Sequence, residues 1–194
     1  RFAVEEMCLI DPAGSEISRI VGDRIAHDLS QDEARASFFS PGFDTPRRNV
    51  YVSPAYISAD VDKWVVAYVT PVVVADKKRA ILHYEHGLDI YQKLLNRDLE
   101  GTASYVLAVD ADGYVVSDSR RVMSVARRAD GDGRSAYFET FSFAGLDLAS
   151  FRQQVDAGAA LTNVTGGPVD AAYSVVEDWT LIAVIDTSQA MAAQ

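Results

Sequence analysis

Leu9-Ile10-Asp11-Pro12-Ala13-Gly14-Ser15-Glu16-Ile17-Ser18 is a motif that recurs as Ala108-Val109-Asp110-Ala111-Asp112-Gly113-Tyr114-Val115-Val116-Ser117. Each copy is typical of a strand, a tight turn built on Asp and Gly, and a returning strand, because Gly permits the positive φ that hairpin turns need. Asp110 follows Asp11 by 99 residues, about half of the 194-residue chain. We therefore expect two related modules in tandem, each opening with a β-hairpin.

The first hairpin is expected over residues 4–20, and a polar connector follows it. Four apolar side chains of this hairpin are expected to face the core: Met7, Leu9, Ile17 and Ile20. In the connector, Ser30 and Glu33 have the spacing of a capping box, which predicts a short helix that reaches Phe38 or Phe39. Three residues that break regular structure exclude a long element after it: Pro41, Gly42 and Pro46.

The remaining elements follow the same order in both halves. Segments rich in β-branched and aromatic residues, bounded by turn residues, are predicted strands. In the first half they span residues 50–53, 64–73 and 79–86, and a helix with apolar residues at helical spacing is expected over residues 88–99. The second half is expected to hold a hairpin over 105–119, a charged loop over 120–134, a helix over 146–157 that ends at Gly158, and strands over 161–165, 169–176 and 179–186.

A hairpin, a helical connector and then further strands predict an α+β fold. Each module is expected to be a roughly five-stranded antiparallel sheet with helices on one face, and the division is expected between residues 1–98 and 99–194. A sheet covered on one face by its own connector can enclose a small cavity. A binding site is therefore expected between a sheet and its cover.

Composition excludes several classes of partner. The chain has 18 basic and 28 acidic residues, a formal net charge of −10, which repels nucleic-acid phosphates and anionic lipid surfaces. The single cysteine, Cys8, cannot form an internal disulfide or build a thiolate metal site alone, so we interpret it as a buried structural thiol. No stretch approaches the ~20 apolar residues of a spanning helix. Because the sequence begins at Arg1, flanking membrane helices are expected outside it.

The order of several short motifs resembles the double Cache domain, the tandem PAS-like extracytoplasmic sensor of bacterial histidine kinases, chemoreceptors and cyclic-dinucleotide enzymes. In the first half the resemblance is carried by the opening run 1–20, Ala36-Ser-Phe-Phe39, Val50-Tyr-Val-Ser-Pro54, Val69-Thr-Pro-Val72 and Ala80-Ile-Leu-His-Tyr-Glu85. In the second half it is carried by Val109-Asp-Ala-Asp-Gly113 and Trp179-Thr-Leu-Ile-Ala-Val184. It covers nearly the whole chain.

The resemblance implies a membrane-distal module near residues 1–95, a membrane-proximal module near 102–190, and a small-molecule pocket in the distal one. It also implies a homodimer in the full receptor and a long helix before the first hairpin, which here is reduced to residues 1–5. The set of Tyr, Arg, Trp and Asp residues by which relatives bind amino acids is not reproduced at its spacing. An amino-acid ligand therefore does not follow from the resemblance.

The strand expected at residues 80–86 carries candidate binding groups. Strand alternation places Ile81, His83 and Glu85 on one face, with His86 on the other. By the resemblance, Glu85 falls where relatives hold the acidic residue that binds a ligand amine, and a carboxylate suits an ammonium or a hydroxyl group. Two alternatives remain: an edge strand whose polar face is solvated, or a metal held by His83, Glu85 and His86, whose ligands cannot all converge from one strand.

Aromatic and polar residues of neighbouring strands could line the same pocket. Trp64, Tyr68 and Thr70 share one face of their strand, and aromatic rings with polar tips are typical of cavities that enclose organic ligands. The set is completed by residues from the flanking segments: Phe39, Arg47, Tyr51 and Ser53. Arg47, with Arg48, could close over an anionic group by bidentate contact. The alternatives are ordinary core packing for the aromatic residues and a solvated surface for the arginines.

Other kinds of site find little support in the residues. The Asp-Gly turns and Asp130-Gly-Asp132-Gly133 suggest calcium, but Asp110-Ala-Asp-Gly does not continue as an EF-hand loop, so hairpin turns explain them better. There is no nucleophile elbow, phosphate-binding glycine loop or zinc-spaced His-Glu motif, and the chain has three histidines: His27, His83 and His86. No catalytic activity and no cofactor are expected of this segment.

These observations predict a sensing region without catalytic activity. Ligand binding is expected to close Glu85 and the rings of Tyr51, Trp64 and Tyr68 around a metabolite and to alter the packing of the helix over residues 88–99. Two alternatives remain open. The first is a structural or dimerising module without a ligand, and the second is a cytoplasmic PAS domain that holds haem or flavin, against which sparse histidines and the lack of a flavin-type Cys motif argue.

Overall fold

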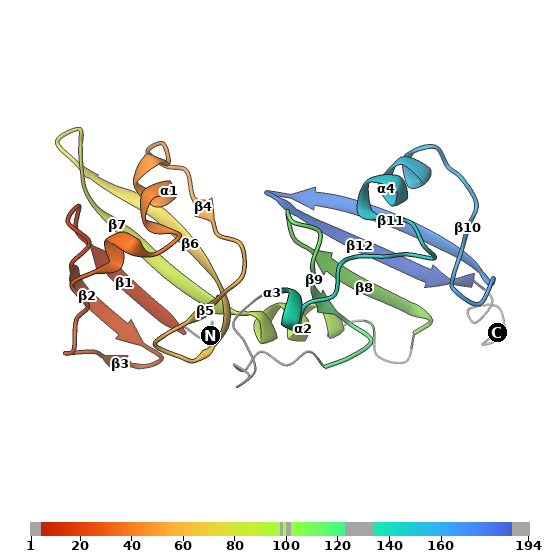
Figure 1. The fold of residues 1–194 in the computed structure, drawn as a ribbon, viewed down its shortest axis with the longest axis horizontal. Helices are drawn as coiled ribbons and strands as arrows, with labels where there is room; N and C mark the ends of the chain where they lie inside the picture. The colour runs from red at the N-terminus through yellow and green to blue at the C-terminus, as the bar shows by residue number, and fades with distance from the viewer. Residues whose placement is uncertain (1–4, 98, 100–101, 123–133, 188–194) are drawn as a thin grey trace. The chain divides into compact units, whose positions relative to one another are not determined.

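The computed structural model describes residues 5–97, 99, 102–122 and 134–187. These residues form two compact units, which we call unit 1 and unit 2, and the boundary between them falls between Leu88 and Asp89 (Figure 1). It lies at the start of helix α2 (Leu88–Asn96), whereas the sequence suggested a division near the end of that helix. The charged loop expected at 120–134 and the helix expected at 1–5 fall largely outside the described residues.

Unit 1 is one antiparallel sheet with its short helices on one face. Its strands are β1 (Glu6–Ile10), β2 (Glu16–Val21), β3 (Arg24–Ile25), β4 (Tyr51–Val52), β5 (Tyr56–Ser58), β6 (Lys63–Val74) and β7 (Lys77–Gly87). They are ordered β3-β2-β1-β7-β6-β4, and β5 also pairs with β6. The connector forms the 3₁₀ helix η1 (Glu33–Arg35) and helix α1 (Phe39–Asp44). The first strand therefore lies in the middle of the sheet, beside the last.

Unit 2 repeats this plan. Its strands are β8 (Ser104–Val109), β9 (Val115–Asp118), β10 (Leu161–Thr162), β11 (Pro168–Val176) and β12 (Trp179–Asp186), ordered β10-β11-β12-β8-β9. Helix α3 (Arg134–Tyr137) and helix α4 (Leu148–Asp156) belong to its connector. Asp147 caps α4 by accepting a hydrogen bond from Ser150 N at 2.8 Å, and Gly158, with φ of +64°, follows its last turn. The prediction of two tandem PAS-like sheets is confirmed.

The two copies of the opening motif fold in the same way. Asp11 Oδ1 accepts hydrogen bonds from Ala13 N and Ser15 N at 2.8 and 3.0 Å. Asp110 Oδ1 accepts the equivalent pair, from Asp112 N and Tyr114 N, both at 3.0 Å. Both turns are therefore Asx turns, in which backbone N–H groups occupy the carboxylate oxygen. The guanidinium of Arg134 also contacts Asp110, so the calcium interpretation is not needed here, while residues 130–133 lie outside the described part.

Gly14 is required at its position in the first turn for two reasons. Its φ is +88°, which side chains with a Cβ rarely adopt, and a Cβ there would lie 2.4 Å from the backbone nitrogen of Ala34. The turn therefore packs closely against the connector, and Glu33 N donates to Gly14 O at 2.9 Å. This contact holds η1 beside the hairpin.

Three local predictions for unit 1 were wrong. The buried residues of β1 are Glu6, Cys8 and Ile10, whereas Ile17 and Ile20 are 52% and 39% exposed, and Met7 and Leu9 are only partly buried. Because β1 has apolar residues on both of its faces, the alternation of residues alone could not show which face is covered. Ser30 forms no capping box, since its backbone nitrogen donates to Glu16 Oε2 at 2.6 Å. Helix α1 and strand β5 were not expected.

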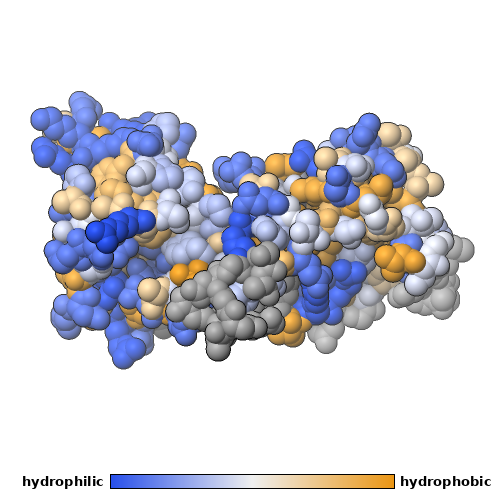
Figure 2. All heavy atoms as spheres, in the orientation of Figure 1, coloured by the Kyte–Doolittle hydropathy of each residue, from blue (hydrophilic) through white to orange (hydrophobic). Residues whose placement is uncertain are grey.

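Each unit has its own core. In unit 1, buried apolar residues of β1, β6 and β7 pack under Phe38 and Phe39. In unit 2, Phe151 of α4 packs against Phe141 and Phe143 at ring distances of 5.4 and 5.2 Å. Figure 2 shows hydrophobic residues on the surface around α4 and β11. Val175 and Val176, at the end of β11, are about half exposed. Within the described residues, no helix is both long enough and apolar enough to cross a membrane.

Candidate functional site

The covered face of the unit 1 sheet, over which η1 and α1 lie, carries an unusual number of polar groups. Directly opposite residues of an antiparallel pair point to the same face. The register pairs Glu6 with Glu85 and Cys8 with His83 across β1 and β7. All four side chains therefore lie together on the covered face, and each residue is at most 3% exposed.

Tyr56 of β5 completes a polar cluster of five residues: Glu6, Cys8, Tyr56, His83 and Glu85. Cys8 Sγ lies 3.2 Å from His83 Nδ1, and Tyr56 Oη lies 3.0 Å from His83 Nε2. The Tyr56 hydroxyl also donates to Glu85 Oε1. One arrangement of hydrogens satisfies all three contacts: the thiol donates to Nδ1, Nε2–H donates to Tyr56, and Tyr56 donates to Glu85. This assigns a neutral His83 that carries its proton on Nε2.

Burial shifts the protonation of every member of this cluster towards the neutral form. Desolvation, together with the nearby Glu85 charge, raises the pKa of Glu6 to about 9. Desolvation raises the pKa of Glu85 to about 7, although the Tyr56 hydrogen bond opposes this shift, and lowers the pKa of His83 to about 3. Burial also raises the pKa of the Cys8 thiol. Near neutral pH Glu6, Cys8 and His83 are therefore held uncharged, whereas Glu85 titrates in that range.

Aromatic side chains close the polar cluster off from solvent. The ring of Phe38 stacks on His83 with a centroid distance of 3.9 Å and an interplanar angle of 22°. The same ring lies 6.0 Å from that of Tyr56. A ligand reaches His83 or Glu85 in this structure only if Phe38 or Tyr56 moves.

A charged pocket of about 510 Å³ lies beside the polar cluster on the β2 side of unit 1. Its charged wall is Arg19, whose guanidinium binds Asp60 Oδ1 at 2.8 Å and Asp28 Oδ1 at 3.0 Å. Asp60 also faces Glu6 and contributes to raising its pKa. The other residues that line the pocket are Val21, Arg24, Ile25, Ala26 and His27. Groups of both charges thus surround one space that adjoins the cluster.

The structure divides the predicted site residues between two faces. His83, Glu85 and Tyr51 lie on the covered face, where Tyr51 pairs with Val69 and packs against the core with Phe39. Ala67 pairs with Glu85, so Trp64, Tyr68 and Thr70, which have the other parity, point to the opposite face. A clamp made of Glu85, Trp64 and Tyr68 therefore cannot form, because the sheet itself lies between them.

The remaining predicted residues have roles in the fold. The Ser53 hydroxyl accepts a hydrogen bond from Ala67 N and donates to Pro54 O, both at 2.9 Å, and continues the strand pairing beyond β4. Thr70 Oγ1 donates to Asn49 O at 2.8 Å. The Arg47 side chain is 60% exposed and lies 3.7 Å from Asp76 Oδ1, in agreement with the solvated alternative. The solvated alternative for Glu85 is wrong, since β7 is a central strand.

Sequence reasoning missed Glu6, Tyr56, Arg19 and Asp60, and it treated Cys8 as structural. A signal for Glu6 and Cys8 was present in the sequence, because Glu6-x-Cys8 has the same strand spacing as the polar pair His83-x-Glu85. What was missing was the knowledge that β1 and β7 are neighbours in this register. Tyr56 reaches the site from the short strand β5 and Asp60 from the turn that follows it, and no local pattern predicts the course of either segment.

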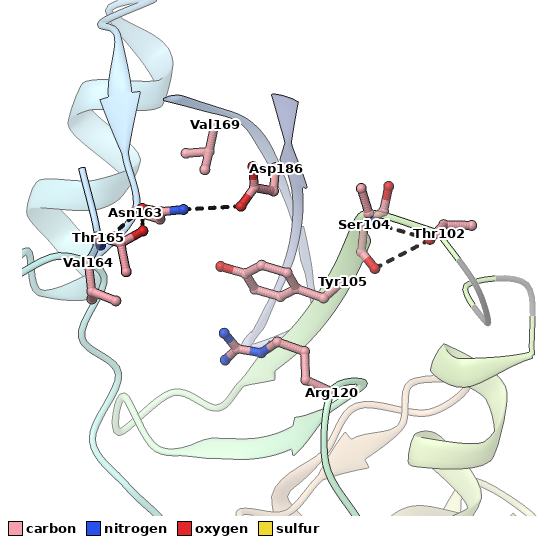
Figure 3. Close-up of a pocket in the computed structure, with 10 residues that line it drawn as sticks. Thr102, Ser104, Tyr105, Arg120, Asn163, Val164, Thr165, Val169 and Asp186 are labelled. Atoms are coloured by element: carbon pink, nitrogen blue, oxygen red, sulfur yellow. Dashed lines mark hydrogen bonds between the residues drawn. The ribbon is translucent and has the colours of Figure 1, made fainter. Parts of the chain in front are cut away.

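Unit 2 has a pocket of about 380 Å³ at the open end of its sheet (Figure 3). Tyr105 of β8, Arg120 and Asp186 of β12 point into it. The Arg120 guanidinium lies 4.1 Å from the centroid of the Tyr105 ring and binds Asp118 Oδ2 at 2.8 Å. Asn163 Nδ2 donates to Asp186 Oδ2 at 3.1 Å. These polar groups bind one another, as Arg19, Asp28 and Asp60 do in the pocket of unit 1.

The fold is shared with sensory domains of bacterial receptors. A domain of a sensory box/GGDEF family protein from Vibrio parahaemolyticus is similar with 15% identity and a TM-score of 0.65, over 96% of this chain and 73% of that one. The sensory domain of the Campylobacter jejuni chemoreceptor Tlp3 with isoleucine bound is similar with 12% identity and a TM-score of 0.62, over 95% of this chain and 67% of that one. The ligand-binding domain of the Pseudomonas fluorescens chemoreceptor CtaA with L-isoleucine is similar with 12% identity and a TM-score of 0.61, over 98% of this chain and 72% of that one.

No protein-family model matches this sequence, and a comparison with curated proteins finds no match. The structural likeness nevertheless spans both units, because it covers 95–98% of the chain in these three cases. The resemblance seen in the order of the sequence motifs is therefore confirmed by the strand order of the two sheets. The chain therefore has the fold of these sensory domains, with two antiparallel sheets in tandem.

Proposed function

We propose that this chain is the extracytoplasmic small-molecule sensing region of a bacterial transmembrane receptor of the histidine kinase, chemoreceptor or diguanylate cyclase type. The observation that carries the proposal is the fold, shared over almost the whole chain with sensory domains of such receptors. Unit 1 is the membrane-distal, ligand-binding module in this proposal, and unit 2 is the membrane-proximal module. The receptor works as a homodimer.

The ligand binds to unit 1 in the pocket between Arg19 and Asp60. Opposite charges in one pocket favour a small polar molecule that carries both an ammonium and a carboxylate, because each charge then finds a charge-assisted hydrogen bond. The bound isoleucine of Tlp3 and CtaA is a molecule of this chemistry. Ligand binding separates Arg19 from Asp60 and shifts the polar cluster through the contact of Asp60 with Glu6.

Signal relay passes through β7 into α2, because Gly87 ends the strand and Leu88 begins the helix with no loop between them. Ligand binding changes signalling only by the difference in its affinity for two receptor states. A shift of β7 is transmitted to α2 without loss in a connecting loop. Gln92 holds α2 to its own unit by donating to Asp118 O at 3.0 Å.

Thermal-shift screening followed by calorimetry tests this proposal. The chain is screened in a chelating buffer against the amino acids, small amines and small carboxylic acids. For a ligand that raises the melting temperature, Asp60→Asn is expected to weaken binding by roughly 10–100-fold, the range of a charged hydrogen bond of about 1.5–3 kcal/mol. Two matched variants are expected to leave the affinity unchanged: Arg47→Gln on the surface of unit 1 and Asp186→Asn in the pocket of unit 2.

A ligand-free structural module is the second candidate, favoured by the packing of Phe38 and Tyr56 over His83. It predicts that no compound of the screen shifts the melting temperature. Binding that Asp186→Asn weakens while Asp60→Asn leaves it unchanged would contradict the placement of the ligand in unit 1 and move it to unit 2.

A further inference from the structure

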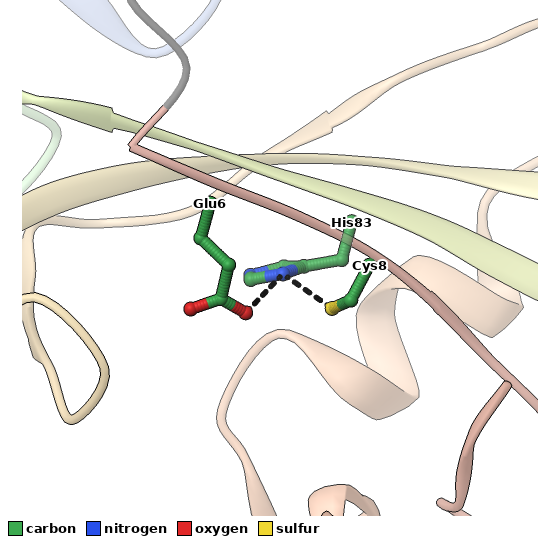
Figure 4. Close-up of side chains that lie close together, drawn as sticks. All are labelled: Glu6, Cys8 and His83. Atoms are coloured by element: carbon green, nitrogen blue, oxygen red, sulfur yellow. Dashed lines mark hydrogen bonds and ion pairs between the residues drawn. The ribbon is translucent and has the colours of Figure 1, made fainter. Parts of the chain in front are cut away.

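Three side chains of the polar cluster bring different metal-binding groups close together. They are the Cys8 thiol, the His83 imidazole and the Glu6 carboxyl group. One ligand atom from each of Glu6, Cys8 and His83 lies within 4.8 Å of the other two. Figure 4 shows the carboxylate of Glu6 and the thiol of Cys8 on the two sides of the same ring nitrogen of His83. This nitrogen, Nδ1, lies 3.9 Å from Glu6 Oε1 and 3.2 Å from Cys8 Sγ.

These separations are close to those of a zinc centre. With bonds of about 2.3 Å to sulfur and about 2.0–2.1 Å to nitrogen and oxygen, the ligand atoms of a tetrahedral zinc ion lie roughly 3.3–3.6 Å apart. The two separations at His83 Nδ1 are within about 0.6 Å of these values, and the ligand atoms of Glu6 and Cys8 lie within 4.8 Å of each other, so side-chain shifts on the order of 1 Å would surround an ion. Thiolate, imidazole and carboxylate together form a donor set typical of zinc.

A second observation points to a ligand independently of these distances. Glu6 Oε2 and Glu85 Oε2 are buried and accept no hydrogen bond from any described residue. Buried polar atoms in native proteins are almost always satisfied, and an ion is one of the groups that can satisfy them. The unpartnered oxygen of Glu6, Oε2, belongs to the carboxyl group whose other oxygen, Oε1, faces His83, so the deficit lies on one of the three donor groups.

The surroundings of His83 match those of a metal-binding imidazole. Such a histidine almost always donates its other ring N–H to a second polar group, which fixes the tautomer and raises the basicity of the binding nitrogen. Here Nε2 faces Tyr56, and Tyr56 in turn donates to Glu85. Tyr56 and Glu85 are thus positioning residues, and they leave Nδ1 available to an ion.

We propose that Glu6, Cys8 and His83 form a binding site for a zinc ion or a similar thiophilic divalent cation, at the centre of the covered face of unit 1. Binding forms metal–oxygen, metal–sulfur and metal–nitrogen bonds and releases the protons of the Glu6 carboxyl and the Cys8 thiol to solvent. One carboxylate and one thiolate neutralise the two positive charges, so the occupied site is buried without net charge. Water supplies the fourth position, which keeps the occupied site neutral.

Cobalt titration of the untagged full chain, freed of metal and without organic ligand, tests this proposal. We expect one Co²⁺ per chain, a thiolate-to-cobalt charge-transfer band in the near ultraviolet, and displacement of the band by Zn²⁺. Since Cys8 is the single cysteine of the chain, the band has no other source. Zinc binding in weakly buffered solution is expected to release about two protons per ion.

Variants separate the metal ligands from their surroundings. Cys8→Ser is expected to remove the charge-transfer band. Cys8→Ser and Glu6→Gln are each expected to weaken zinc binding by at least about 100-fold. Tyr56→Phe, which changes a residue that only positions His83, is expected to weaken zinc binding by roughly 10–100-fold. His86→Gln, a change of the histidine that lies on the opposite face of β7, is the matched control and is expected to bind zinc as the unchanged protein does.

The proposal is overturned if the folded, unmodified protein shows no thiolate band with Co²⁺, or if zinc affinity falls with His86→Gln but not with Cys8→Ser. The first result needs no variant, so misfolding of a variant does not affect it. The inference goes beyond the proposed sensing of an organic ligand, and it can fail separately. The metal titration contains no organic ligand, and the ligand screen contains a chelator.

Discussion

The central strand pairs of the two units occupy equivalent places and carry opposite chemistry. In unit 1, Cys8 of β1 faces His83 of β7. At the equivalent place in unit 2, 99 residues after Cys8, Leu107 of β8 faces Ile182 of β12. Since the same fold is built with an apolar pair in unit 2, the polar pair of unit 1 is not needed to form it. Buried polar groups that the fold does not require indicate a binding role.

The largest loss of stability is expected when the apolar core of unit 2 is disrupted. Phe151→Ala removes a fully buried ring that packs against two others and is expected to lower the free energy of unfolding of unit 2 by about 3–5 kcal/mol. Urea unfolding followed by the fluorescence of Trp179, in a Trp64→Phe background, measures it. Val175→Ala, at a half-exposed position, is the control, expected within about 0.5 kcal/mol of the parent. A loss below about 1 kcal/mol for Phe151→Ala contradicts a tightly packed core.

In unit 1, a similar decrease in the free energy of unfolding is expected when a buried ionic network is disrupted. The Arg19 side chain is 7% exposed and pairs with Glu16, Asp28 and Asp60. Arg19→Ala leaves the buried Glu16 carboxylate without its partner and is expected to cost about 3 kcal/mol. Arg24→Ala, an exposed arginine of the same pocket, is expected to cost less than about 0.5 kcal/mol. Equal effects of the two variants in urea unfolding, followed by Trp64 fluorescence, would show that the network is only a surface feature.

The pH dependence of stability sharpens the comparison, because only unit 1 buries facing carboxyl groups in its central strand pair. The folded state raises the pKa of Glu85 from 4.5 to about 7 and that of Glu6 from 4.5 to about 9. A folded pKa above the unfolded one stabilises the protein below the unfolded value, and this stabilisation disappears as the pH rises through the folded value. The metal-free unit 1 is therefore expected to lose stability between about pH 5 and pH 9, by up to about 1.4 kcal/mol per pH unit for each proton.

Glu85→Gln is the check on this prediction, because it removes the group that titrates near neutral pH and keeps the shape of the side chain. The variant is expected to show a flatter profile in urea unfolding series recorded with a chelator. A profile of unit 1 that stays level from pH 5 to pH 9 in the unchanged protein would contradict the buried, neutral state of the cluster.

The smallest effect is expected for Arg47→Ala. The Arg47 side chain is 60% exposed, and its partner Asp76 is 96% exposed, so their attraction is screened by water. The change is expected to alter the stability of unit 1 by less than about 0.5 kcal/mol and to leave ligand and metal affinity unchanged. A measurable loss of ligand affinity would restore the earlier interpretation that this arginine closes over an anionic group.

Local patterns predicted most of the secondary structure. Long segments bounded by Gly, Pro or Asp became β6, β7, β11, β12 and α4 with small changes at their ends, because propensity and turn chemistry act over a few residues. Helix α1 and strand β5 were missed, because both are short and depend on contacts with β6. Gly42 illustrates this dependence, since a Cβ at that position would lie 2.4 Å from Val69 Cγ1.

The candidate site was predicted only in part. His83 and Glu85 were singled out because two polar residues share one face of an otherwise apolar strand. Trp64 and Tyr68 were grouped with them by residue type, but pairing of Ala67 with Glu85 puts these rings on the other side of the sheet. A shift of register by one residue would have reversed this outcome, and no feature of a single strand specifies the register.

The sequence by itself determined the duplication, the order of strands and helices, and the Asx turns that open both units, since each of these depends on residues close together in the chain. Only the tertiary structure decided which face of β1 is covered and which distant residues meet there. Glu6 and Cys8 lie 75 or more residues from His83 and Glu85, and only the antiparallel pairing of β1 with β7 brings them together. Burial then sets their chemistry, because a carboxyl group or thiol removed from water is held neutral until a partner of opposite charge is bound.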